Sequence, residues 1–91
     1  MRTHELKTWP AAFAAVKAGT KRHEIRANDR DYAEGDVVVL REWDPTPFNF
    51  SPYGYTSAPS LRFIIGTVTP GGQWGLPPGL CVFTLLPGAS R

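Results

Sequence analysis

The chain has 91 residues, a formal net charge of +2 at pH 7 and 42% hydrophobic residues. This composition excludes an intrinsically disordered chain, and no apolar run reaches the ~20 residues that a membrane-spanning helix needs. A single cysteine excludes an intrachain disulfide and, with two histidines, a zinc site of the usual Cys/His kind.

The length predicts one small domain over residues 1–91. Such a chain buries only roughly 60–65% of its unfolded surface, so we expect any site to be a cleft or the mouth of a barrel. The first residues contain no apolar segment of the kind found in signal peptides. We therefore expect a protein of the reducing cytoplasm, without a membrane partner.

The first elements are a short strand over residues 3–7 and a helix that begins at Pro10. Proline suits the first helical position, and Thr8 or Trp9 is the expected cap. The following residues are mostly alanine, and Gly19 is the expected left-handed residue after the last turn. Trp9 is predicted to belong to the apolar stripe of this helix and, like Trp43, to the core.

Strand patterns follow at residues 22–27 and 37–43, separated by turn-forming residues. In the first of these strands Glu24 shares a face with Arg22 and Arg26, because side chains alternate along a strand. His23 points to the other face, which favours a packed or exposed histidine over a catalytic one.

The second half of the chain contains two long loops and two strands. Residues 44–60 hold four prolines, which favour a loop, with a short hairpin near Tyr55 as one option. Strands are predicted at 61–69, with a bulge at Gly66, and at 80–86, where Cys81 is a buried small hydrophobe rather than a nucleophile. The fold class is therefore mainly β with one or two short helices, arranged as a small, partly closed β-barrel.

Charged side chains are concentrated near the N-terminal third of the chain. The segment from Gly19 to Arg30 holds four of the ten Lys and Arg residues and two of the eight acids. No acid follows Asp44. The polar chemistry therefore belongs to the first half, and the second half is expected to be scaffold.

Several motifs in this half resemble the ASCH superfamily, over residues 4–45 and more faintly over 61–69 and 80–86. The motif residues are His4-Glu5-Leu6-Lys7, Trp9-Pro10, Gly19-x-Lys21-x-x-Glu24-x-Arg26-x-Asn28-Asp29-Arg30-Asp31-Tyr32 and Gly35-Asp36-Val37, followed by Leu40-Arg41-Glu42-Trp43-Asp44-Pro45. The resemblance implies a PUA-like β-barrel that either binds RNA or modified bases, or removes acyl groups from N4-acylated cytidine.

The hydrolytic relatives supply a lysine that corresponds to Lys21, a threonine at the position of Glu24, and a later glutamate. This chain lacks the last two, so a threonine mechanism does not transfer. In the amidohydrolase hypothesis Glu24 is the general base, Lys21 stabilises the oxyanion and protonates the leaving amine, and Glu42 is an auxiliary carboxylate. The alternative is that Lys21 and Glu24 form an ordinary ion pair at the start of a strand.

The candidate substrate-binding residues are Arg26, Asn28, Tyr53, Tyr55 and Trp74. Arg26 either grips a phosphate or carboxylate, or braces the barrel through Glu24 or Asp36. Asn28 either reads a base or fixes a turn. The loop aromatics, with Phe48 and Phe50, either stack on a pyrimidine or plug the open ends of the barrel.

We expect neither a metal nor a cofactor. The expected partner is a small nucleoside substrate or RNA, and the expected state is a monomer or weak homodimer. In the RNA-binding alternative the contact surface is a cationic patch made of Lys7, Lys17, Lys21, Arg22, Arg26 and Arg30.

Overall fold

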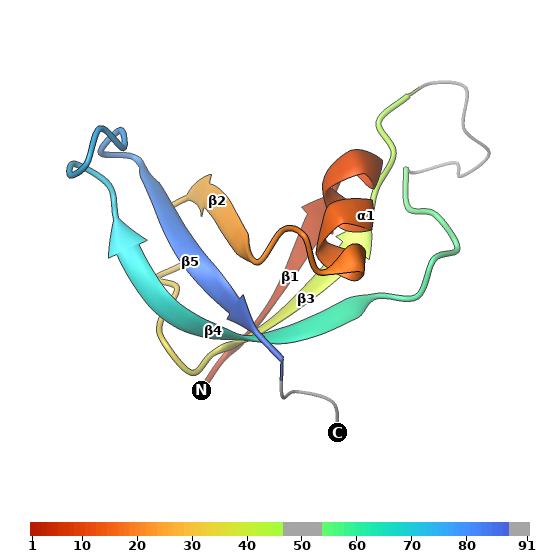
Figure 1. Cartoon of the computed structure of the whole chain (residues 1–91), viewed down its shortest axis with the longest axis horizontal. Helices are drawn as coiled ribbons and strands as arrows, with labels where there is room; N and C mark the ends of the chain where they lie inside the picture. The colour runs from red at the N-terminus through yellow and green to blue at the C-terminus, as the bar shows by residue number, and fades with distance from the viewer. Residues whose placement is uncertain (47–53, 88–91) are drawn as a thin grey trace.

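A curled five-stranded sheet with one α-helix forms the part of the chain that the computed structural model describes, residues 1–46 and 54–87 (Figure 1). The elements in chain order are β1 (Thr3–Thr8), α1 (Pro10–Ala18), β2 (His23–Ala27), β3 (Val37–Glu42), β4 (Leu61–Pro70) and β5 (Leu80–Leu86). The prediction of a mainly β, partly closed barrel with a short helix is confirmed.

The strand order in the sheet is β1-β3-β4-β5-β2, so β1 and β2 form its two edges. β1 and β3 are parallel, and the other neighbouring strands are antiparallel. The sheet curls like half a barrel, and α1 lies over the end that β1 and β3 form (Figure 1). This curl brings β1 and β2 toward each other, although they do not pair.

The core fills the concave side of the sheet. Alternate residues of β1 are buried, and Leu40, Ile65 and Phe83 from β3, β4 and β5 are completely buried. Helix α1 adds Phe13 and Val16, which lie one turn apart on its inner face.

The helix begins and ends where the sequence predicts. Trp9 is the N-cap residue, Pro10 opens the first turn, and Gly19 has a left-handed φ of 83°. The prediction that Trp9 belongs to the core is wrong, because its side chain is 60% exposed. Its backbone is extended (φ −65°, ψ 155°), so the side chain does not continue the stripe that Phe13 and Val16 form.

The predicted bulge near Gly66 is confirmed by a shift of register between Ile65 and Val68 in the β4–β5 pairing. The Thr84 hydroxyl from β5 lies against this bulge and accepts a hydrogen bond from the Thr67 backbone N–H at 2.9 Å. A Cβ atom at position 66 would lie 2.3 Å from that hydroxyl, so the close approach requires glycine.

Arginine side chains bridge the gap between the two edge strands. The Arg26 guanidinium donates to the Lys7 carbonyl at 2.8 Å, and Arg30 donates to the Glu5 carbonyl at 3.0 Å. These carbonyls lie on the edge of β1 that faces away from β3. Side-chain donors thus replace a backbone ladder at the seam and satisfy acceptors that an open edge would leave exposed.

A buried polar pair fixes the connection that leads into β3. His4 Nε2 lies 2.9 Å from Asp36 Oδ2, and the backbone N–H groups of Arg2 and Ala33 also donate to the Asp36 carboxylate. The bond from His4 holds the pKa of Asp36 below its ordinary value of 3.8. Tyr32, predicted to lie in a turn, is buried with its ring 4.8 Å from those of His4 and Phe83.

Candidate functional site

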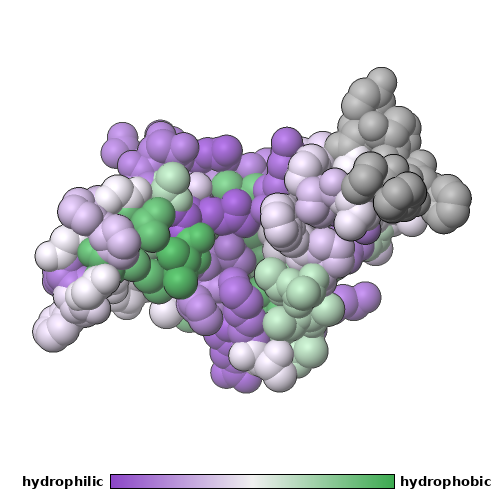
Figure 2. All heavy atoms as spheres, turned by 90° about the horizontal axis from the view of Figure 1, so that it is seen from above, coloured by the Kyte–Doolittle hydropathy of each residue, from purple (hydrophilic) through white to green (hydrophobic). Residues whose placement is uncertain are grey.

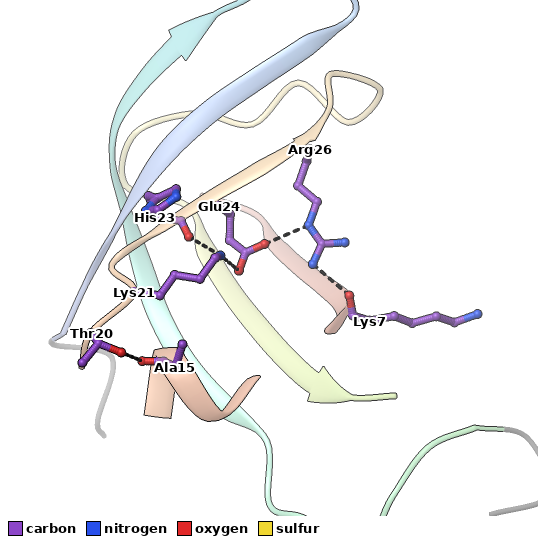
Figure 3. Close-up of polar contacts among 7 residues, drawn as sticks. All are labelled: Lys7, Ala15, Thr20, Lys21, His23, Glu24 and Arg26. Atoms are coloured by element: carbon purple, nitrogen blue, oxygen red, sulfur yellow. Dashed lines mark hydrogen bonds and ion pairs between the residues drawn. The ribbon is translucent and has the colours of Figure 1, made fainter. Parts of the chain in front are cut away.

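Glu24 lies on the inner face of β2 and is bound by two cations. Lys21 Nζ is 3.1 Å from one carboxylate oxygen, and Arg26 Nε is 3.0 Å from the other. Figure 3 shows the two cations approaching Glu24 from opposite sides. The Glu24 side chain is 5% exposed, whereas those of Lys21 and Arg26 are 25% and 24% exposed. The charge at the centre is buried, but both of its partners reach solvent.

The local chain path explains this arrangement. Glu24 and Arg26 are two residues apart on β2, so they share a face, as predicted. Lys21 lies in the connection that follows α1, and its ammonium also donates to the His23 carbonyl at 2.6 Å. His23 itself is exposed. Because β2 turns Glu24 inward, its apolar neighbour Ile25 faces out and is 52% exposed.

A cleft of about 380 Å³ opens beside this ion triplet, between α1, β2 and the end of β1. Its described lining consists of Lys7, Thr8, Trp9, Ala12, Lys21, Glu24, Ile25 and Arg26. Figure 2 shows that hydrophilic residues separate the hydrophobic area near β2 and the β4–β5 hairpin from the side that carries α1. Glu24 and Arg26 of β2 form a charged side of the cleft, and Trp9, the N-cap residue of α1, forms an aromatic side.

Thr8 contributes an unusual group to the cleft. Its side chain is 3% exposed, and its Oγ1 atom has no hydrogen-bond partner among the described residues. An unpaired buried hydroxyl costs about 1–3 kcal/mol, so native structures seldom keep one without a reason. Thr8, which lines the cleft next to Trp9, thus has a buried hydroxyl without a partner among the described residues, whereas Trp9 is 60% exposed.

Sequence reasoning did not select Thr8 or Trp9 for this site. Trp9 could have been recognised from the proline that follows it. Pro10 opens the helix, so Trp9 is the N-cap residue and its side chain does not join the apolar stripe of α1. Nothing local could place Thr8 near Glu24, because the two residues meet only when the sheet curls.

The third predicted catalytic residue, Glu42, does not belong to the described lining of this cleft. It ends β3, and its carboxylate accepts a hydrogen bond from the Thr56 hydroxyl at 2.7 Å. The structure therefore brings Lys21 and Glu24 together and places Glu42 in a separate contact.

Among the predicted binding residues that the structure describes, Arg26 lines the cleft, and Asn28, Tyr55 and Trp74 do not belong to its described lining. Asn28 is exposed, and its backbone N–H donates to the Gly79 carbonyl at 2.9 Å. Trp74 is 89% exposed in the β4–β5 connection, with a left-handed φ of 57°. Tyr53, like Phe48 and Phe50, lies outside the described residues.

Tyr55 belongs to a separate cluster of cations and aromatic rings. The Arg41 guanidinium lies 3.8 Å from the centre of the Tyr55 ring, and Lys7 Nζ lies 4.8 Å from that of Trp43. Trp43 and Tyr55 also form an isolated β-bridge. The ring of Tyr55 is thus covered by a cation, a contact typical of stable surface packing.

The cations of the predicted RNA-binding patch have separate roles. Arg26 and Arg30 bridge the seam, Lys21 binds Glu24, and Lys7 lies over Trp43. Lys17 and Arg22 make no ion pair with the described residues, although Arg22 Nε donates to the Gly19 carbonyl.

Cys81 is completely buried, and this burial raises the pKa of its thiol and favours the unreactive neutral form. In residues 1–46 and 54–87, no group of three or more His, Cys, Asp and Glu side chains is placed to hold a metal ion. No helix in these ranges is long and apolar enough to cross a membrane.

A family model for DUF3850, a domain of unknown function, matches residues 3–85, nearly the whole described sheet. The chain belongs to the DUF3850 family. It is also similar to a protein of Escherichia phage P2, described as an uncharacterized 12.9 kDa protein in the GpA 3' region. The two are 43% identical over 42 residues, a stretch that covers 46% of this chain and 38% of the phage protein. The family match includes every described residue that lines the cleft.

Proposed function

We propose that the cleft binds a single nucleobase, presented by a nucleoside or an RNA. The observation that carries the proposal is that Thr8, whose buried hydroxyl is unpaired among the described residues, lines the same cleft as the exposed Trp9 and the Glu24 ion triplet. A ligand that hydrogen-bonds to Thr8 removes the cost of leaving this group unpaired.

The chemistry of the cleft suits a flat, polar ring. Trp9 offers an aromatic surface for stacking, a contact that contributes about 1–3 kcal/mol per base in other proteins. Glu24 accepts hydrogen bonds from an exocyclic amine, and Thr8 and the remaining N–H groups of Arg26 donate to ring nitrogen and carbonyl oxygen. Cytosine presents these groups along one edge, so we take it as the first ligand to test.

The size of the cleft and the sequence motifs also support the proposal. A volume of about 380 Å³ lies within the range of roughly 300–1,000 Å³ typical of small-molecule sites. The resemblance of residues 4–45 to ASCH domains implies the same class of ligand, and we propose kinship with that superfamily on these motifs.

The test is calorimetric titration of cytidine and N4-acetylcytidine into the wild type and three variants. Thr8→Val keeps the shape of the side chain and removes the hydroxyl, so binding should weaken about tenfold, the loss of one hydrogen bond to a buried group. Trp9→Ala should weaken it by a similar factor. Thr67→Val, which changes an exposed threonine of β4, is the matched control and should bind as the wild type does.

Two results would contradict the proposal. One is the absence of heat with either nucleoside at millimolar concentration. The other is equal affinity in the wild type, Thr8→Val and Trp9→Ala, which would place any binding elsewhere on the protein.

Amide hydrolysis at the same cleft is a second candidate, favoured by the 3.1 Å contact between Lys21 Nζ and Glu24. In this reaction Glu24 takes a proton from water, which attacks the acyl carbon of an N4-acylcytidine. Lys21 stabilises the oxyanion and gives a proton to the leaving N4 nitrogen, so that cytidine and a carboxylate are formed. Binding alone ranks first because it needs Glu24 only as an acceptor, and each carboxylate oxygen can accept a second hydrogen bond. Hydrolysis instead needs a proton to move to a carboxylate that two cations already bind.

Incubation with N4-acetylcytidine followed by chromatography separates the two candidates. Hydrolysis requires cytidine to form with the wild type and not with Lys21→Ala or Glu24→Gln. Glu42→Gln tests the auxiliary role predicted for that residue and should leave turnover unchanged, since Glu42 lies outside the described lining. Binding of the nucleoside without any cytidine would reject hydrolysis and retain the binding function.

A further inference from the structure

A second and larger hollow lies on the other side of Lys21. This groove has a volume of about 590 Å³ and lies between the end of α1, the connection to β2, and strands β4 and β5. Its apolar lining includes Val16, Leu61, Phe63 and Leu85. Phe63 is only partly buried, so an aromatic ring is accessible in the groove.

Three cations and no acid belong to the described lining of this groove. The cations are Lys17, Lys21 and Arg22. Lys21 is partly neutralised by Glu24, but Lys17 and Arg22 have no ion-pair partner among the described residues. The Arg22 side chain is anchored through Nε to the Gly19 carbonyl at 3.0 Å, which leaves its terminal N–H groups for a ligand. The groove is therefore suited to a ligand with a flat apolar part and a negative charge.

Lys21 lines both the groove and the nucleobase cleft, so the two hollows adjoin at this side chain. Sites for single-stranded nucleic acids combine these features: aromatic or apolar surfaces for successive bases, and cations for the phosphates between them. An acidic, apolar peptide would also match the groove alone, but the shared Lys21 favours a ligand that continues from the cleft.

We infer that the groove binds the nucleotide next to the base held in the cleft, so that the ligand is single-stranded RNA or DNA rather than a free nucleoside. This inference rests on the nucleobase proposal. Lys17 and Arg22 bind the phosphate between the two nucleotides, and the apolar wall with Phe63 binds the second base. The phosphate adds charge and the second base adds apolar contact, so a strand binds more tightly than a nucleoside.

The experiment compares cytidine with a short cytidine oligoribonucleotide, measured at several salt concentrations. The oligonucleotide should bind the wild type at least about tenfold more tightly than cytidine, since a second base stacks and phosphates bind cations. The double variant Lys17→Ala/Arg22→Ala should lose this gain while its affinity for cytidine stays the same. Its plot of log K against log salt should be less steep by about 0.7, the loss of contact with one phosphate of a single strand.

The matched control is Arg41→Ala/Arg62→Ala, which removes the same charge from residues that line neither hollow. It should retain the tighter binding of the oligonucleotide. Phe63→Leu preserves an apolar side chain without the ring, and should weaken the oligonucleotide and not cytidine.

The outcomes separate this inference from the proposal on which it rests. If cytidine binds and the oligonucleotide binds no more tightly, or if the control double variant loses as much affinity as Lys17→Ala/Arg22→Ala, the inference is overturned and the nucleobase proposal stands. If neither ligand binds, both fail. An acidic peptide of alternating Glu and Leu that shifts the amide resonances of Val16 and Phe63, where the oligonucleotide does not, would assign the groove to a protein partner and overturn the inference.

Discussion

Two buried carboxylates on opposite sides of the seam have different surroundings. Asp36 and Glu24 are 5% and 4% exposed. Asp36 is bound by the buried His4 and by the backbone N–H groups of Arg2 and Ala33, so its side-chain partner belongs to the packed interior. Glu24 is bound by Lys21 and Arg26, whose side chains reach the wall of a cleft. The burial of a charge therefore does not reveal its role, whereas the exposure of its side-chain partners does.

The largest effect is expected from removing the carboxylate of Asp36. Asp36→Ala should lower the free energy of unfolding by about 3 kcal/mol, because His4 and two backbone N–H groups lose a buried partner. Urea denaturation followed by circular dichroism measures this change. Asp29→Ala, at a side chain that is 68% exposed, is the control and should change stability by less than about 0.5 kcal/mol.

Removing the carboxylate of Glu24 should lower the free energy of unfolding less than removing that of Asp36. Glu24→Ala should lower the free energy of unfolding by about 1 kcal/mol, because Lys21 and Arg26 can turn to water when their partner is lost. The same denaturation assay applies. A larger loss for Glu24→Ala than for Asp36→Ala would reverse the assignment of the two carboxylates as site and scaffold.

Acid should reduce the contribution of Asp36 to the stability of the fold. The pKa of Asp36 is lower in the folded protein than its ordinary value of 3.8, so its contribution to stability is complete above that pH. As the pH falls below 3.8, the unfolded chain takes up the proton first, and stability is lost until the folded form is also protonated. The difference in stability between the wild type and Asp36→Ala should therefore shrink between pH 7 and about pH 3. An unchanged difference would show that the carboxylate is not ionised in the folded state.

The smallest change in stability, and the one expected to be stabilising, concerns Thr8. Thr8→Val replaces an unpaired buried hydroxyl with a methyl group of similar shape, so stability should stay the same or rise by about 1 kcal/mol. Thermal unfolding measures the change. Clear destabilisation would mean that the hydroxyl has a partner in the folded protein and would remove the main support for the cleft as a binding site.

Sequence patterns with short-range causes were predicted well. The alternation along residues 22–27 placed Glu24 and Arg26 on one face, and Pro10 and Gly19 marked the two ends of the helix. The strand near Gly66 and its bulge were also predicted, because a glycine within an apolar run marks a close approach.

Contacts between residues that are far apart in the sequence were not predicted. Thr8 and Trp9 line the cleft beside Glu24 only because the curled sheet brings β1 near β2. His4 and Asp36 are 32 positions apart, and their bond depends on the parallel pairing of β1 with β3. The loop aromatics that were predicted to bind a base did not indicate where the cleft lies. Trp74 is exposed in the β4–β5 connection, and Tyr55 packs under Arg41.

The positions of the helix and strands, and the grouping of charged residues after Gly19, could be predicted from the amino-acid sequence. These follow from backbone geometry and side-chain alternation, which act over a few residues. By contrast, it is the folded sheet that brings Lys21, Glu24 and Arg26 to the same cleft as Thr8 and Trp9. Glu42 and Asn28 do not belong to the described lining of that cleft. This arrangement results from the curl of the sheet, which depends on the packing of all five described strands around one core and not on any single segment.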